Sequence, residues 1–299
     1  GRPASSVHPT FLRIPIWDWV PWVGGMSIPI HAYGVMVALG MLAGIWVTVL
    51  RARRAGMSPE IFYDLGFWSM LAGILGARAA YVAVHWAEFP DGRPGYREHV
   101  WDVLKIWEGG QVLYGGLILA VLVDLWLIHR RNLPVLKVAD VAAPAVALGI
   151  AIGRIGCLLN GCCWGRRVDE SFPLGLRFPS TSAVYAGDAQ GIFGASEPAW
   201  PVHPTQIYAI LSGVMLYIVL SFWYERRRWE GQILAGTMIG YALIRFAEEH
   251  FRADTPRLPR FWGTLSLNAG QYVSIYVLAA GVLCYLVWGA RARAKLQDL

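Results

Sequence analysis

Seven runs of mostly apolar residues, each long enough to cross a lipid bilayer, occupy most of this chain of 299 residues. A helix rises about 1.5 Å per residue, so about 20 apolar residues cross a hydrocarbon core of roughly 30 Å. The sequence therefore predicts an all-α integral membrane protein with seven transmembrane helices, organised as one polytopic domain over residues 1–299. The expected spans are about 28–50, 61–87, 112–128, 138–164, 203–223, 232–250 and 271–290.

The composition argues against a soluble enzyme, a coiled coil and a disordered chain. Apolar residues make up 56% of the sequence and charged residues 15%, against roughly 45–50% and 25% in soluble domains. The net charge of +6 would indicate nucleic-acid binding in a soluble protein. Here most basic residues stand between the apolar runs, where membrane proteins carry them, so we expect no nucleic-acid partner.

The distribution of basic residues predicts the orientation. In the long connections, 1–27, 88–111, 165–202 and 251–270, acidic residues largely balance the basic ones. The positive-inside rule then places the N-terminus outside, the C-terminus in the cytoplasm and 165–202 in an extracytoplasmic loop or head. The short connections and the C-terminal tail hold Arg51, Arg53, Arg54, Arg130, Arg131, Lys137, Arg226, Arg227, Arg228, Arg291, Arg293 and Lys295.

Three arginines, Arg78, Arg154 and Arg245, fall inside expected spans. A charge there is expensive and is a functional candidate; the alternatives are structural ion pairs and side chains that extend to the interface. Counted from the cytoplasmic ends, the three lie roughly 26, 24 and 21 Å deep. They therefore share a level in the outer leaflet, which predicts one cavity there. Other polar residues expected near this level are His31, Tyr33, Tyr114, Asn160, His203 and Gln206.

The sixth span carries Tyr241, Arg245 and Glu249 at a spacing of four residues, which lines them along one helix face. A glutamate one turn from a buried arginine orients the guanidinium and leaves donors for an anion. The alternative is that the two residues only pair the helix with itself.

Four glycines surround Arg154 at the end of the fourth span: Gly153, Gly156, Gly161 and Gly165. Glycine weakens a helix and lets a backbone approach a ligand closely, although tight helix packing would need the same residues. Gly-Gly pairs stand on both sides of Tyr114. A tyrosine at the water interface is commonly a belt residue, whereas the flanking glycines favour a backbone and a hydroxyl that face a ligand. In the first span, Gly40 and Gly44 form a pair that permits close helix packing, and ordinary use of glycine in membrane helices is the alternative.

The cysteines Cys157, Cys162 and Cys163 have a spacing that suits neither a zinc site nor a redox pair. We interpret them as small packing residues, with a vicinal disulfide or a reactive thiol as alternatives. The sequence has no phosphate-binding loop, zinc-protease motif or nucleophile elbow. It therefore predicts no metal site and no cofactor, and a transferred group would come from a donor that carries its own leaving group.

Several motifs are spread along the chain. They are His31-x-Tyr33-Gly34, Trp107-Glu108-Gly109-Gly110, Asp140 with Pro144, Gly153-Arg154-x-Gly156 followed by Asn160-Gly161 and Trp164-Gly165-Arg166, His203-Pro204-Thr205-Gln206-x-Tyr208, and Tyr241-x3-Arg245-x3-Glu249-x2-Arg252. In these motifs, and over nearly its whole length, the chain resembles the phosphatidylglycerol–prolipoprotein diacylglyceryl transferase family. The fourth-span signature is the most specific part of the resemblance.

The resemblance implies a multi-pass protein of the bacterial inner membrane, with its active site facing the outer leaflet and the periplasm. Such an enzyme moves diacylglycerol from phosphatidylglycerol to the lipobox cysteine in the signal peptide of a prolipoprotein. It forms a thioether, releases glycerol phosphate and begins lipoprotein maturation. The catalytic residues implied here are Arg245, Tyr114, Tyr241, Tyr33 and His31. The residues expected to bind phosphatidylglycerol are Arg154, Asn160, Gly165, Glu249 and Arg78.

The chain departs from the family pattern at three positions. Tyr114 stands where well-studied members have a histidine proposed as the base, and Cys157 and Cys162 replace an asparagine and a glutamate. A neutral tyrosine, with an ordinary pKa of about 10, is a poor base at pH 7. Tyr114 is therefore expected either to position the substrate or to be activated by nearby arginines.

Two other function classes follow from these departures. A catalytically altered homologue would bind phosphatidylglycerol and form no thioether. A thiol-based membrane redox protein would use Cys162 and Cys163, and would lose activity when both become serine.

Overall fold

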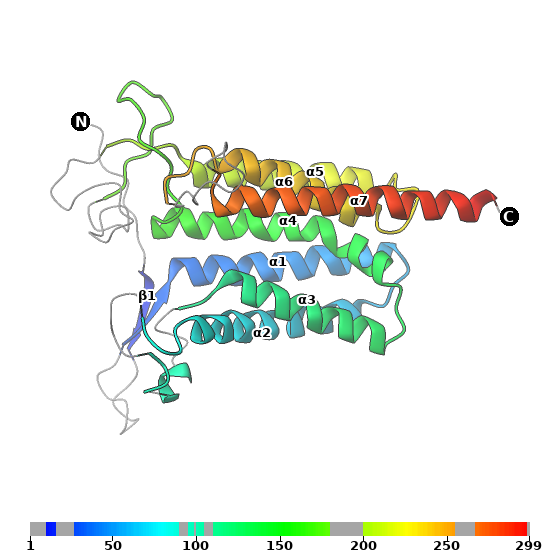
Figure 1. Cartoon of the computed structure of the whole chain (residues 1–299), viewed down its shortest axis with the longest axis horizontal. Helices are drawn as coiled ribbons and strands as arrows, with labels where there is room; N and C mark the ends of the chain where they lie inside the picture. Colours follow the sequence, from blue (N-terminus) through cyan, green and yellow to red (C-terminus); the bar gives the residue numbers. More distant parts are fainter. Residues whose placement is uncertain are drawn as a thin grey trace. The chain divides into compact units, whose positions relative to one another are not determined.

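The structure is a computed structural model that describes residues 10–15, 27–89, 95–98, 100–104, 110–179, 200–254 and 267–297. These residues form seven α-helices, a short 3-10 helix and a two-stranded sheet (Figure 1). The elements are β1 Thr10–Pro15, β2 Ser27–His31, α1 Ala32–Arg54, α2 Pro59–Val84, η1 Val100–Leu104, α3 Leu113–Arg130, α4 Val135–Asn160, α5 Thr205–Tyr224, α6 Gln232–Glu248 and α7 Ala269–Gln297.

Each of the seven predicted spans corresponds to one α-helix. Six are long and apolar enough to cross a membrane, and α6 is shorter, at 17 residues. The helical, membrane-type fold is thus confirmed, while the count of seven spans and the orientation stay predictions. Large apolar side chains also point outward, as at Trp46 (63% exposed) and Tyr276 (70% exposed), a pattern that soluble monomers avoid over large areas.

The all-α prediction missed the antiparallel sheet of β1 and β2, in which Thr10 pairs with His31 and Pro15 with Ser27. The first span was expected to begin near residue 28, but α1 begins at Ala32. Pro29 explains the later start, because proline lacks an N–H group and disfavours helical geometry in the residue before it.

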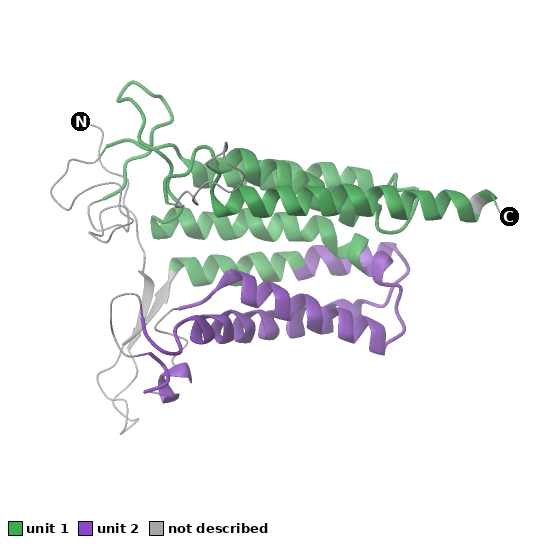
Figure 2. Ribbon diagram, in the orientation of Figure 1, with its two compact units in different colours: residues 1–44, 139–299 green, residues 45–138 purple. Residues whose placement is uncertain are grey.

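The chain divides into two compact units, residues 1–44 with 139–299 and residues 45–138 (Figure 2). Both α1 and α4 contribute residues to each unit. The single polytopic domain expected from the sequence stays a prediction, and each unit is described by itself.

Glycines bring the helices of the first unit close together. A Cβ atom on Gly40 of α1 would lie 2.9 Å from the carbonyl oxygen of Gly149 in α4, and one on Gly44 would lie 3.7 Å from that of Ala145. On α5, a Cβ on Gly213 would contact Ala151 at 3.0 Å. The structure therefore shows close packing at Gly40, whereas a Cβ on Gly44 would make an ordinary van der Waals contact.

Glycines also set the contact between α2 and α3 in the second unit. A Cβ on Gly115 would lie 2.6 Å from the carbonyl oxygen of Gly76, and one on Gly116 would lie 2.6 Å from that of Gly73. Helix packing therefore accounts for the Gly-Gly pair that follows Tyr114, and a ligand is not needed to explain it.

Asp140, in α4, holds the start of α6. Its carboxylate is fully buried, at 0% exposure for the residue, and accepts hydrogen bonds from the backbone N–H groups of Gly231 (2.8 Å), Ile233 (3.0 Å) and Leu234 (2.9 Å). The first N–H groups of a helix lack partners within it, so this side chain satisfies them from a distant helix. It thereby positions the helix that carries Arg245.

Replacing Asp140 with alanine should lower the stability of the protein by about 2 kcal/mol, because buried N–H groups lose their acceptor. The Tm measured in detergent should fall clearly. Asp140→Asn, which keeps one acceptor oxygen, should fall less. An unchanged Tm for the alanine variant would contradict this role.

Candidate functional site

The end of α4 is a tight turn built on glycine. Gly161 has a φ of +69°, and its N–H donates to the carbonyl of Leu158 (3.3 Å) while that of Cys162 donates to the carbonyl of Cys157 (3.1 Å). This pattern is the Schellman motif, which folds the residue after the glycine back onto the last turn of the helix. The fourth span, expected to reach residue 164, therefore ends at Asn160, and Cys162 is turned toward Cys157.

The segment that follows pairs with the segment after α6. The N–H of Arg166 donates to the carbonyl of Phe251 (2.8 Å), and that of Ala253 donates to the carbonyl of Trp164 (3.2 Å). Gly165 allows this approach, since a Cβ there would lie 3.0 Å from the Phe251 oxygen and 2.5 Å from that of His203. The pairing joins the end of the fourth-span signature to the end of the sixth-span motif.

Two side chains at the start of α5 fasten the same turn. Thr205 Oγ1 donates to the carbonyl of Cys163 (2.6 Å), and Gln206 Nε2 donates to the carbonyl of Cys162 (2.7 Å). Both Thr205 and Gln206 are buried. Three separate segments therefore fix the backbone around the cysteines.

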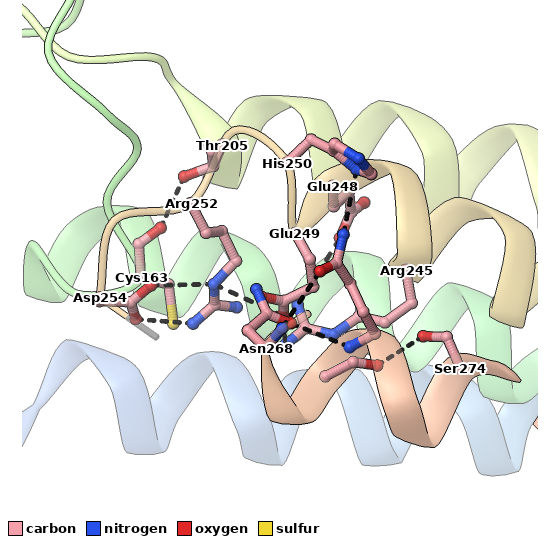
Figure 3. A network of polar contacts seen from close by, with 12 residues as sticks. Cys163, Thr205, Arg245, Glu248, Glu249, His250, Arg252, Asp254, Asn268 and Ser274 are labelled. Carbon is pink, nitrogen blue, oxygen red and sulfur yellow. Dashed lines mark hydrogen bonds and ion pairs between the residues drawn. The ribbon is translucent and has the colours of Figure 1, made fainter. Parts of the chain in front are cut away.

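Arg245 and Glu249 form the ion pair that their spacing predicted (Figure 3). Glu249 is 1% exposed, and its Oε2 also accepts a hydrogen bond from Asn268 Nδ2 (2.8 Å). Gly270 makes room for this carboxylate, because a Cβ there would lie 2.5 Å from Glu249 Oε1. The guanidinium of Arg245 is thus held by an acid that is itself fixed from α7.

Arg252 adds a second held guanidinium. It forms a two-point contact with Asp254, from Nε to Oδ1 (2.9 Å) and from Nη2 to Oδ2 (2.6 Å), and its Nε lies 3.9 Å from Glu249 Oε1. Burial raises the pKa of the Asp254 carboxyl, and the hydrogen bonds from Arg252 oppose that shift. In Figure 3 the sulfur of Cys163 lies beside this guanidinium.

Arg154 differs from both, because no residue in the described part of the chain forms a hydrogen bond or ion pair with it. It is partly buried, within electrostatic range of Cys163, Cys157, Arg252 and Glu248. Glu248 Oε2 in turn lies 3.9 Å from Arg245 Nη1, a buried nitrogen without a hydrogen-bond partner among the described residues. The arrangement leaves guanidinium donors that suit an anion such as a phosphate.

Four of the other expected site residues lie on these same elements. Tyr33, in the first turn of α1, packs against Gly156, where a Cβ would lie 3.2 Å from the tyrosine ring, and it is within electrostatic range of the three cysteines and Arg154. Tyr241 stands one turn before Arg245 on α6, Asn160 ends α4, and Gly165 shapes the paired segment.

His31 is described only in its backbone, which ends β2; its side chain lies outside the described residues. The family motif at 107–109 also lies outside them, as does most of the expected head, at 180–199. No geometry is assigned to these parts of the predicted site.

Arg78 and Tyr114 belong to the second unit. Arg78 is 6% exposed and donates to the carbonyls of Asp102 (2.6 Å), Val103 (2.9 Å) and Gly110 (3.2 Å). These contacts anchor the segment between α2 and α3, and headgroup binding by Arg78 stays a prediction. Tyr114 is the second residue of α3 and is 52% exposed.

Sequence reasoning left three contributors out of the expected site. Arg252 stood in the sixth-span motif, three residues after Glu249, so helix spacing was a usable signal for it. Asp254 and Asn268 carried no local signal, because one lies in an irregular segment and the other before α7. The three cysteines were interpreted as packing residues, yet their sulfurs all lie within 4.8 Å of one another and could hold a metal ion.

Comparison with known proteins identifies the family to which the chain is similar. Residues 22–287 match the model of the family described as prolipoprotein diacylglyceryl transferase. The chain is 31% identical to the phosphatidylglycerol–prolipoprotein diacylglyceryl transferase of Erwinia tasmaniensis, over 95% of this chain and 96% of that protein. It is 30% identical to the protein of the same name from Cronobacter sakazakii, over 96% and 98% of the two chains, and 33% identical to that from Paracidovorax citrulli, over 78% and 77%.

Proposed function

The chain belongs to the prolipoprotein diacylglyceryl transferase family, and we propose that its arginines hold the phosphate of phosphatidylglycerol while the diacylglyceryl group passes to a prolipoprotein. It is a multi-pass bacterial membrane protein and a transferase of lipoprotein maturation. Family membership favours this function over a lipid-binding homologue without catalysis and over a thiol redox protein.

The proposal rests on how the guanidinium groups of the first unit are paired. Arg154 forms no ion pair with an acidic residue in the described part of the chain, and Arg252 and Glu248 both lie within its electrostatic range. Two neighbouring positive charges repel each other, so an anion between them is favourable. A phosphodiester offers the oxygen acceptors that arginine forks bind best, and the site has a further buried donor in Arg245 Nη1.

The positive charge of the arginines matters most when the bond between the glyceryl carbon and the phosphate oxygen breaks. The thiolate of the acceptor cysteine attacks the glyceryl carbon, a C–S bond forms, and the C–O bond to phosphate breaks. Its electron pair leaves with glycerol phosphate, and the thiol proton goes to solvent. Arg154 and Arg245 stabilise the leaving phosphate, and Glu249 with Asn268 keeps Arg245 in place.

The remaining roles rest on position and on the family resemblance. Tyr33 and Tyr241 orient the substrates beside the arginines, and His31 contributes from the end of β2, directly before α1. Asn160 and Gly165 shape the backbone around the headgroup. Arg78 either binds the donor lipid or holds the segment of the chain that approaches the lipid.

We further propose seven spans, with the N-terminus outside, the C-terminus in the cytoplasm and the site facing the outer leaflet of the inner membrane. Basic residues in the last turns of α1 and α7, including Arg53 and Lys295, support this orientation. The acceptor is then a prolipoprotein signal peptide whose lipobox cysteine reaches the site from the membrane.

Mass spectrometry tests the function directly. Purified protein, phosphatidylglycerol and a lipobox peptide should yield a peptide that carries one diacylglyceryl group in thioether linkage, and a peptide with serine in place of the cysteine should not react. Full activity of Arg245→Ala would overturn the mechanism. Binding of phosphatidylglycerol without any thioether product would overturn the function.

Tyr114→Phe tests whether the hydroxyl takes part. As a positioning donor, Tyr114 should contribute one hydrogen bond of about 1 kcal/mol, so turnover should fall by up to about tenfold. The initial rate of peptide lipidation is the measurement. A loss of about 100-fold or more would assign proton transfer to the hydroxyl, and unchanged turnover would remove Tyr114 from the site.

A further inference from the structure

The three cysteines at the end of α4 lie close enough together to bind one metal ion. The sulfurs of Cys157, Cys162 and Cys163 all lie within 4.8 Å of one another, and the last two side chains are only partly buried. With Zn–S bonds of about 2.3 Å, sulfurs on one tetrahedral zinc ion lie about 3.8 Å apart. The sulfurs, which are at most 4.8 Å apart, are therefore within about 1 Å of the separation that a shared ion requires.

The backbone holds this arrangement in advance. The Schellman motif at Gly161 brings Cys162 back over Cys157, and the positive φ of Cys163 (+62°) turns the chain once more. Thr205 and Gln206 bind the carbonyls of the two later cysteines. A residue other than glycine keeps a positive φ only where its surroundings enforce it. Here the buried residues Thr205 and Gln206, at the start of α5, do so.

The charges around the cluster also suit thiolate ligands. Arg154 and Arg252 are both within electrostatic range of Cys163. Three thiolates around one divalent ion carry a net charge of −1, which a guanidinium group neutralises. The same arginines serve the proposed phosphate site, so the cluster stands beside the reacting groups.

We propose that Cys157, Cys162 and Cys163 bind one Zn²⁺ ion, and that its fourth position takes the thiol of the acceptor cysteine. This inference rests on the proposed transferase function. Catalytic zinc sites have three protein ligands and one open position. Thiolates are soft donors, so they favour zinc over divalent ions such as Mg²⁺ and Ca²⁺, which prefer oxygen ligands.

The coordinated thiol would then be the nucleophile. Binding to Zn²⁺ removes its proton, which passes to water, because a coordinating thiol is deprotonated outright. The bound thiolate attacks the glyceryl carbon of phosphatidylglycerol, the C–S bond forms, and the C–O bond breaks with its electron pair leaving on glycerol phosphate. The zinc ion does not change oxidation state. No histidine or tyrosine base is then required to take the proton of the acceptor thiol.

Metal binding is tested on the full-length protein in detergent, without reference to turnover. Elemental analysis after Zn²⁺ loading should give one zinc per chain, and Co²⁺ loading should give the intense sulfur-to-cobalt absorption of thiolate coordination. Cys163→Ser and Cys162→Ser should each weaken Zn²⁺ binding at least about tenfold in competition with a chelator. Cys284→Ser is the matched control, since Cys284 lies on α7 outside the cluster, and it should bind as the wild-type protein does.

The open position is tested with the acceptor. A lipobox peptide should shift the visible spectrum of the Co²⁺-loaded protein, and the peptide with serine in place of cysteine should not. Chelator treatment should lower peptide lipidation at least about tenfold, with recovery on addition of Zn²⁺.

Three results would overturn the proposal: no stoichiometric zinc in the folded wild-type protein, equal binding by both cluster variants, or a metal-free protein that transfers at the full rate. Loss of two hydrogens from the wild-type cluster, found by mass spectrometry of unreduced protein, would assign a disulfide instead. If zinc binds as described but no thioether forms from phosphatidylglycerol, the transferase function fails and the metal site stands.

Discussion

Replacing Arg154 with alanine should lower the rate of diacylglyceryl transfer at least about 100-fold, the effect expected when a preorganised donor to a developing charge is removed. The fold should survive, because no described residue forms a hydrogen bond or ion pair with Arg154. Its removal also relieves the repulsion from Arg252. The initial rate of peptide lipidation and the Tm in detergent, measured together, separate chemistry from stability.

Two further variants sharpen this experiment. Arg154→Lys keeps the charge but loses the planar two-point donor, so its rate should stay well below that of the wild-type protein. Arg291→Ala removes an exposed arginine from the end of α7 and should leave the rate unchanged. Wild-type turnover in Arg154→Ala would show that this guanidinium does not contact the leaving phosphate.

Glu249→Ala should damage both stability and activity. The carboxylate is buried between Arg245 and Arg252 and accepts a hydrogen bond from Asn268. Removing one partner of a buried ion pair leaves uncompensated charge and costs about 3–5 kcal/mol. We expect a large fall in Tm and, in the fraction that stays folded, a loss of transfer, because Arg245 is no longer held in one orientation.

Two further variants distinguish the role of Glu249 from that of an exposed acidic residue, by their effects on Tm and on transfer. Glu249→Gln keeps an acceptor for Asn268 and nearly the same volume, so it should fold better than the alanine variant while transfer stays impaired. Glu230→Gln, an exposed acid before α6, is the control and should change neither quantity. A Glu249→Ala variant with normal Tm and normal transfer would contradict the network in Figure 3.

The cysteines show what spacing alone leaves out. As a linear pattern, C-x4-C-C resembles neither a zinc motif nor a redox motif, and packing was the natural interpretation. In the structure the same spacing joins two positions of a helix C-cap that face each other around Gly161. The signal was available in the glycine that follows Asn160, provided that the helix end had been placed there.

Arg78 and Arg154 show a second limit. The depth calculation treated the two arginines alike, because each stands in the outer part of an expected span. Arg78 is surrounded by main-chain carbonyls, whereas no described residue pairs with Arg154. Helical rise gives the height of a side chain, but its partners come from segments far away in sequence.

By itself the sequence determined the seven helices and the pairing of Arg245 with Glu249. These features depend on the length of apolar runs and on the fixed spacing of residues along one helix, which are local properties. Only the tertiary structure decided the hairpin before α1, the capping of α6 by Asp140, the contacts of Arg252 with Asp254, and the cysteine cluster. Each of these depends on a cap conformation or on pairing between distant segments, whose free energy depends on neighbours that no short stretch of sequence contains.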